Sequence, residues 1–108
     1  MFKNGMRPVH PGEVLREDYL KPLGMSVNAL AKALRVPASR INDIVLERRG
    51  MSPDTALRVT RYFGGDEDDA QGWINLQAIY DFKVAAKTVG KAIAKEVRPR
   101  GLDAPAHA

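Results

Sequence analysis

The chain has 108 residues, of which 44% are hydrophobic, so we expect a single domain with a compact core. It contains no cysteine, which excludes disulfides and thiolate metal sites, and no apolar run approaches the roughly 20 residues of a membrane span, so a soluble, cytoplasmic protein is expected. The net charge of +4 is concentrated in residues 1–65, where eleven lysines and arginines face six acidic residues, and this basic part favours an acidic partner such as a nucleic acid.

Residues 1–9 show no periodic pattern and are expected to form a flexible arm. The first helix should begin at His10, because Pro11 suits a first helical turn and Glu13 suits the positive end of the helix dipole. Pro22 should end this helix, since a proline disfavours helical backbone in the residue before it.

His10 is interpreted as part of this helix start rather than as a catalytic base or a metal ligand. The other histidine, His107, lies in a terminal segment without periodicity. Neither residue is accompanied by a nucleophile, a carboxylate pair or further metal ligands at a suitable spacing. We therefore expect no enzyme activity, no cofactor and no bound metal.

Two short helices with a tight joint come next. Residues 27–34 and 38–46 each carry apolar side chains at helical spacing, and only Arg35, Val36 and Pro37 separate them. Helices joined by three residues cannot lie side by side, so they must cross steeply. The pattern predicts a helix-turn-helix.

The outer face of the second of these helices is expected to be polar, because its aliphatic residues fall on one side. Ser, Asn and Arg side chains can pair with base edges in a DNA major groove, which is about 12 Å wide and admits a helix. Arginines before and after the helix are candidates for phosphate contacts. An ordinary exposed face with solvated arginines is the alternative. The candidate DNA-binding residues are Arg35, Pro37, Ala38, Ser39, Arg40, Asn42, Asp43, Arg48 and Arg49.

A third helix should follow, with Ser52 as its N-cap and Pro53 in its first turn. Its side chains expected to be buried are Ala56, Leu57, Thr60 and Phe63. Gly64 can supply the left-handed residue that ends it. The acidic run at residues 66–69 should start the next helix, because negative charge stabilises a helix N-terminus.

Residues 73–84 carry seven large apolar side chains in twelve positions, which is more than one buried face needs. We expect this helix to have two partners, one of them a second copy of the chain. Complete burial within its own domain is the alternative. The predicted dimer contacts are Trp73, Ile74, Leu76, Ile79 and Tyr80.

Lysines then recur every four residues, at positions 83, 87, 91 and 95, and should form a ridge along one helix face. Like charges at this spacing are mildly destabilising, so the ridge is expected to be marginal unless it binds something acidic. DNA phosphate, a partner protein and plain solvent all remain open. Residues 10–86 are thus interpreted as the domain, and 87–108 as a basic, partly disordered tail.

Several stretches resemble one known family. LAKALRVPASRINDIV, at residues 30–45, resembles the two central helices of Cro/repressor-type (XRE) regulators. Together with HPGEVLREDYL at residues 10–20, RRGMSPDTALRVTRYFG at 48–64 and WINLQAIYDFKVA at 73–85, it resembles the HigA-type antitoxins of toxin–antitoxin modules. The chain departs from their pattern at Arg35, where such turns often carry glycine, and in the acidic link GGDEDDAQG at residues 64–72.

The resemblance implies an all-α, five-helix, lambda-repressor-like helix-turn-helix domain with a C-terminal dimerisation helix. It implies a homodimer that binds double-stranded DNA at an operator inverted repeat, with half-sites about one helical turn, ~34 Å, apart. It further implies repression of the protein's own operon and neutralisation of a HigB/RelE-like toxin that cleaves mRNA. A stand-alone XRE-type repressor without a toxin partner is the alternative.

Overall fold

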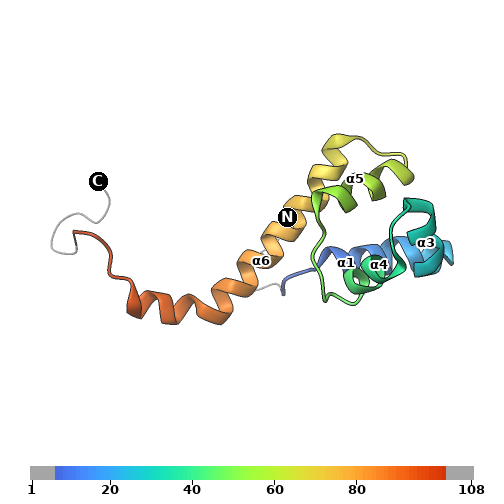
Figure 1. The fold of residues 1–108 in the computed structure, drawn as a ribbon. Helices are drawn as coiled ribbons and strands as arrows, with labels where there is room; N and C mark the ends of the chain where they lie inside the picture. Colours follow the sequence, from blue (N-terminus) through green and yellow to red (C-terminus); the bar gives the residue numbers. More distant parts are fainter. Residues whose placement is uncertain (1–6, 102–108) are drawn as a thin grey trace.

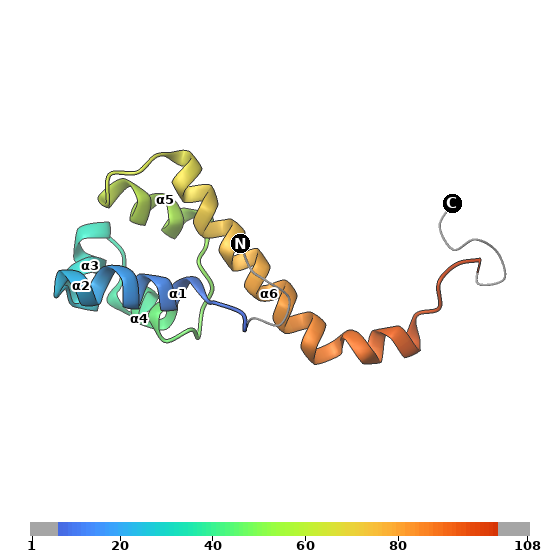
Figure 2. The same ribbon diagram turned by 180° about the vertical axis from the view of Figure 1, so that it is seen from behind.

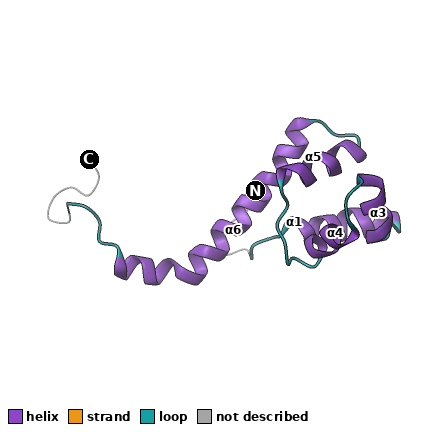
Figure 3. Ribbon diagram, in the orientation of Figure 1, coloured by secondary structure: helices purple, strands orange, loops and turns teal. Residues whose placement is uncertain are grey.

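Residues 7–101 are described by a computed structural model, and every regular element within this range is a helix (Figure 3). The elements are α1 (Pro11–Val14), η1 (Leu15–Leu20), α2 (Lys21–Leu23), α3 (Val27–Leu34), α4 (Ala38–Val45), α5 (Pro53–Tyr62) and α6 (Glu67–Glu96). The elements α1, η1 and α2 follow one another without a break and form one helical rod, which we call the first rod. With α3, α4, α5 and α6, residues 7–101 thus contain five helical rods, which confirms the expected fold class. None of these helices is long and apolar enough to span a membrane. The expectations for residues 1–6 and 102–108, His107 included, lie outside the described residues.

The first rod begins as predicted. The His10 side chain caps α1 by accepting a hydrogen bond from the backbone N–H of Gly12 at 2.8 Å, and Pro11 follows it in the first turn. The prediction that Pro22 ends the rod is wrong, because the helical path continues to Leu23 and ends at Gly24, whose φ is +61°. The turn before the proline is a π-turn, in which the Lys21 N–H reaches the carbonyl five residues back. In a regular α-helix a proline ring clashes with the carbonyl four residues before it. The wider π-turn shifts that carbonyl relative to the ring, so the helical path can pass Pro22.

The core lies where the first rod, α3, α4 and α5 meet (Figures 1 and 2). Its fully buried aliphatic side chains are Leu15, Leu30, Ile41, Ile44 and Val59. Gly12 allows α1 to approach α4 closely, since a Cβ at this position would lie only 1.7 Å from the carbonyl oxygen of Ile44. The Arg16 side chain also donates a hydrogen bond to the carbonyl of Val45 near the end of α4. These contacts fix α4 against the first rod.

Helix α5 begins as predicted at Ser52, whose hydroxyl accepts from the Thr55 N–H, and Gly64 follows its end with φ +81°. The prediction that Leu57 is buried is wrong: its side chain is 52% exposed, whereas Val59 is 1% exposed. Val59 lies on the same helix face as the buried Ala56, and Leu57 is turned about 100° away from that face.

The acidic run starts α6, as predicted. Asp66 is the N-cap, and its side chain and that of Asp69 form reciprocal hydrogen bonds with each other's backbone N–H groups. The first turns of α6 pack against α5, and the rest projects away from the domain (Figures 1 and 2), giving the Cα trace extents of 59 × 25 × 25 Å. The helix continues well past residue 86, and it bends in its second half, where the Thr88 hydroxyl donates to the carbonyl of Val84 at 2.7 Å.

Candidate nucleic-acid interface

The outer face of α4 is exposed and polar, as its periodicity predicts. Ile41, Ile44 and Val45 are buried, while Ser39 and Asn42 face solvent on the opposite side. Pro37 precedes the helix with extended backbone, and within residues 7–101 no side chain caps the first amides of α4. The N-terminal half of α4 therefore presents small polar side chains and uncapped backbone N–H groups to the same solvent region.

The N-terminus of α3 lies beside this face. A shallow hollow of about 340 Å³ is lined by Ser26, Val27, Asn28, Ala38, Ser39 and Asn42. The first three of these residues were not predicted as candidates. Ser26 nevertheless carries a signal in the sequence, because it caps an eight-residue helix by accepting from the Ala29 N–H at 3.0 Å, and helix N-termini bind phosphate groups.

Arg40 lies on the flank of the face and is held by a carboxylate. Its Nη1 is 2.8 Å from Oδ2 of Asp54, and Nε of Arg58 is 2.9 Å from the same oxygen. The hydrogen bonds from Arg58 and Arg40 lower the pKa of the Asp54 carboxyl. Arg58 also donates to the carbonyl of Leu34 at 2.9 Å, so this cluster joins α3, α4 and α5. The ion pair with Asp54 thereby fixes the orientation of the Arg40 side chain. The remaining N–H groups of its guanidinium can still donate hydrogen bonds to another partner.

The other predicted arginines lie away from the hollow beside Ser39. Arg35 ends α3 with left-handed backbone (φ 59°, ψ 46°) and lines a different groove, which it shares with Arg58 and Arg61. Arg48 and Arg49 follow the opposite end of α4. Asp43 holds them, with its carboxylate oxygens 3.0 Å and 4.0 Å from their guanidinium groups. The structure thus brings Ala38, Ser39 and Asn42 together, and places the arginines at the edges of the face.

The predicted dimer contacts on α6 differ in accessibility. Trp73 is only 9% exposed, and its ring centroid is 5.5 Å from that of Tyr19 in the same chain. Tyr80 makes an edge-to-face contact with His10 at 4.8 Å. Ile74 and Leu76 are half-buried, and Ile79 is 39% exposed. Farther along α6 are exposed apolar side chains that were not predicted as contacts: Phe82, Val89 and Ile93.

In a comparison with known proteins, residues 17–69 match the helix-turn-helix family. The chain is 63% identical over 83 residues to virulence-associated protein I of Dichelobacter nodosus, covering 77% of this chain and 74% of that protein. Antitoxin HigA of Pseudomonas aeruginosa, solved with the higBA promoter, is 47% identical with a TM-score of 0.79, covering 87% of this chain and 99% of that one. An addiction module antidote protein of the HigA family from Coxiella burnetii is 46% identical with a TM-score of 0.76, over 87% and 99% of the two chains.

Proposed function

This chain belongs to the HigA family of helix-turn-helix proteins, regulators rather than enzymes, and on that premise we propose that it is an antitoxin and autorepressor. In this proposal a dimer binds the operator of its own operon in the cytoplasm. The same protein neutralises a HigB-type toxin that cleaves mRNA. DNA binding and toxin binding have different support and are tested separately.

The exposed face of α4 beside the N-terminus of α3 is the observation that carries the DNA-binding proposal. With α4 in the major groove, Ser39 and Asn42 would face base edges, and the backbone amides at the start of α3 would face phosphate. Arg48 and Arg49 would contact phosphates at the edge of the site. The whole basic excess of the sequence lies in residues 1–65, which include α3 and α4, and this charge favours the same partner.

Asn42→Ala tests base readout. If Asn42 pairs with a base, the substitution should weaken binding to the promoter of the protein's own operon by about 1–3 kcal/mol, while binding to unrelated DNA stays the same. Fluorescence anisotropy with both DNAs at one fixed salt concentration measures the difference. Equal weakening on both DNAs would show that Asn42 does not read a base.

We place the dimer contact on the exposed part of α6. Ile79, Phe82, Ala86, Val89 and Ile93 recur at alternating steps of three and four residues, the spacing at which two helices pack as a coiled coil. A second copy offers the same stripe, so two α6 helices can cover each other. Trp73 supports this contact indirectly, because it holds the start of α6 in its own domain.

Toxin neutralisation rests on family membership, and the neighbouring gene tests it. If a small open reading frame beside this gene is toxic when expressed alone, but harmless and co-purified when expressed with this chain, the antitoxin role is supported. If the neighbour is harmless or does not bind, the chain is a stand-alone XRE-type repressor. That result would leave the DNA-binding proposal intact.

A further inference from the structure

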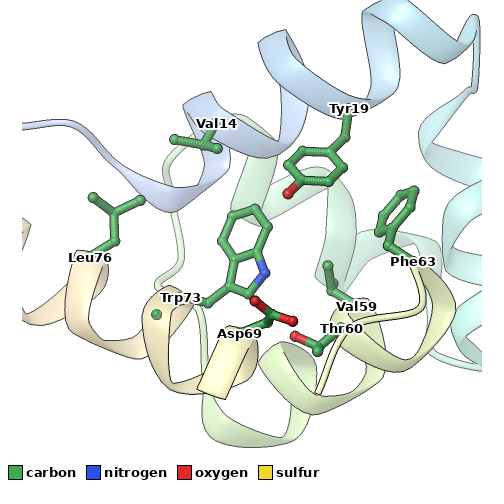
Figure 4. Close-up of a pocket in the computed structure, with 10 residues that line it drawn as sticks. Val14, Tyr19, Val59, Thr60, Phe63, Asp69, Trp73 and Leu76 are labelled. Atoms are coloured by element: carbon green, nitrogen blue, oxygen red, sulfur yellow. The ribbon is translucent and has the colours of Figure 1, made fainter. Parts of the chain in front are cut away.

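A hollow of about 390 Å³ lies between the first helical rod, α5 and the start of α6, and none of its residues lines the hollow beside α4 (Figure 4). This volume falls within the range of small-molecule binding sites. The lining side chains come from the first rod, from α5 with the residue that follows it, and from α6, so the first rod is distant in the sequence from the other two helices. They are Val14, Tyr19, Val59, Thr60, Phe63, Asp69, Trp73 and Leu76.

The aromatic rings of Tyr19, Phe63 and Trp73 line part of this hollow. The ring centroid of Tyr19 is 4.9 Å from that of Phe63 and 5.5 Å from that of Trp73, and both pairs are tilted rather than stacked. In Figure 4 the Trp73 indole lies beside Tyr19, Phe63 lies on the other side of Tyr19, and the Asp69 carboxylate lies below the indole. The faces of aromatic rings attract cations, and the attraction increases where water is excluded.

The polar groups in the hollow also favour a cation. Asp69 contributes a carboxylate, and none of the described residues that line the space is a lysine, arginine or histidine. The adjacent acidic residues 66–68 add negative charge at the same end of α6. Thr60 is 6% exposed, and its hydroxyl is the one buried side-chain polar atom in residues 7–101 that lacks a hydrogen-bond partner. A buried hydroxyl without a partner is costly, so a ligand that hydrogen-bonds to it would relieve that cost.

We propose that this hollow binds a small organic ammonium ion, that is, a protonated amine attached to an apolar or aromatic body. The body packs among Tyr19, Phe63 and Trp73. The ammonium group donates to the Asp69 carboxylate and to the Thr60 hydroxyl, as an N⁺–H donor can. This inference requires neither DNA nor a toxin, so it can fail while the proposed function stands.

Trp73 provides the measurement, because it is the only tryptophan in the chain and it lines the hollow. Its fluorescence is followed while the wild-type protein is titrated with 2-phenylethylamine, which is protonated at pH 7. The matched compounds are neutral 2-phenylethanol and anionic 3-phenylpropanoate. We expect a saturable change with the amine, an apparent Kd at least tenfold higher for the alcohol, and no saturation with the carboxylate. Equal affinities for all three compounds, or no saturation with any, would overturn the proposal.

Two glycine substitutions locate the binding. Gly72 lines the hollow and Gly90 lies far along α6, and a Cβ at either position meets nothing within 4 Å. Gly72→Leu should fill the space and raise the Kd for the amine at least tenfold, whereas Gly90→Leu should leave it unchanged. Equal effects of the two substitutions would contradict the location, provided that circular dichroism shows both variants folded.

Asp69→Asn tests the charge preference. An asparagine can still accept the hydrogen bond from the Asp66 N–H that starts α6, so the helix start is retained. The preference for 2-phenylethylamine over 2-phenylethanol should fall to about twofold or less. If the full preference persists in this variant, the carboxylate does not recognise the cation and the proposal is wrong.

Discussion

At the scale of single residues, Arg35 is held in an unfavourable backbone conformation. Its φ of 59° lies in the left-handed region, where a Cβ costs roughly 1–2 kcal/mol relative to ordinary helical backbone. Arg35→Gly should remove this strain, but part of the gain is offset because glycine has greater conformational freedom in the unfolded chain. The net stabilisation of the fold should be about 0.5–1 kcal/mol. Thermal unfolding measures the shift.

Arg49→Gly is the control for this substitution. It removes the same charge from an exposed position whose φ is not positive, so it should lower the melting temperature. If Arg35→Gly is destabilised to the same extent as Arg49→Gly, backbone strain at residue 35 is negligible.

Gly12 shows the opposite constraint, because here the backbone is relaxed and the space is filled. A Cβ would lie 1.7 Å from the oxygen and 2.7 Å from the carbon of the Ile44 carbonyl, and neither atom can move as a flexible side chain would. Gly12→Ala should cost about 2–4 kcal/mol in the free energy of unfolding, because α1 must shift away from α4. Urea unfolding measures it. Gly90→Ala, in an open part of α6, should instead stabilise the protein by about 0.5–1 kcal/mol.

At the scale of helices, His10 joins the start of α1 to α6. Its Nδ1 must be unprotonated to accept the Gly12 N–H, and its ring packs edge-on against Tyr80. Burial lowers the pKa of His10, and nearby Arg16 adds to this, while Glu47 and Asp81 act in the opposite direction. A folded-state pKa below the unfolded value of about 6.5 means that the unfolded chain takes up the proton first as the pH falls.

This linkage predicts stability that depends on pH below neutrality. The contribution of neutral His10 should be complete above pH ~6.5 and should decline as the pH falls below it, with a slope of at most about 1.4 kcal/mol per pH unit, until the lower folded-state pKa is passed. Urea unfolding between pH 5 and 8 measures the slope. His10→Asn retains a capping side chain that does not titrate, so its stability should be lower but flatter over this range. An unchanged slope in the variant would assign the effect to other groups.

The helix starts could be predicted from the sequence because capping is local. Ser52 and Asp66 act as caps in the structure, and each needs only the few residues after it. The prediction that Pro22 ends the first helix was wrong because the rule for prolines assumes that a regular α-helix precedes them. Here a π-turn precedes the proline ring. The choice between Leu57 and Val59 as the buried residue depends on where α5 docks, which no local pattern encodes.

The candidate site shows the same division. Helical periodicity was sufficient to place Ser39 and Asn42 on the exposed side of α4. It could not show that Ser26 and Asn28 line the same hollow, because that depends on how α3 crosses α4. Similarly, the apolar richness of α6 was evident, but the burial of Trp73 against Tyr19 required the three-dimensional structure.

At the scale of the whole molecule, the structure consists of a small helical domain and a projecting helix. C-terminal to Tyr80, most of the surface of α6 is exposed rather than packed against its own domain, and Phe82 is 73% exposed. A 30-residue helix of which so much is unsupported gains stability from a partner that covers its apolar stripe. In the proposed dimer the same contact sets the distance between the two α4 helices, so dimerisation and operator binding should weaken together.

Phe82→Asp tests this coupling without disturbing the core. Because Phe82 is largely exposed, the substitution should change the stability of the monomer by no more than about 0.5 kcal/mol. It should weaken the dimer by at least about 2 kcal/mol, since it replaces a central apolar contact by a charge, and operator affinity should fall with it. Sedimentation equilibrium and fluorescence anisotropy measure the two effects.

Lys91→Gln provides the control, because it changes the net charge by the same amount on the opposite face of α6 and should leave the dimer intact. If Phe82→Asp instead leaves the protein dimeric, the second copy is held by another surface. If the variant becomes monomeric yet binds the operator as tightly as the wild type, each domain binds its half-site independently, and α6 has no part in DNA recognition.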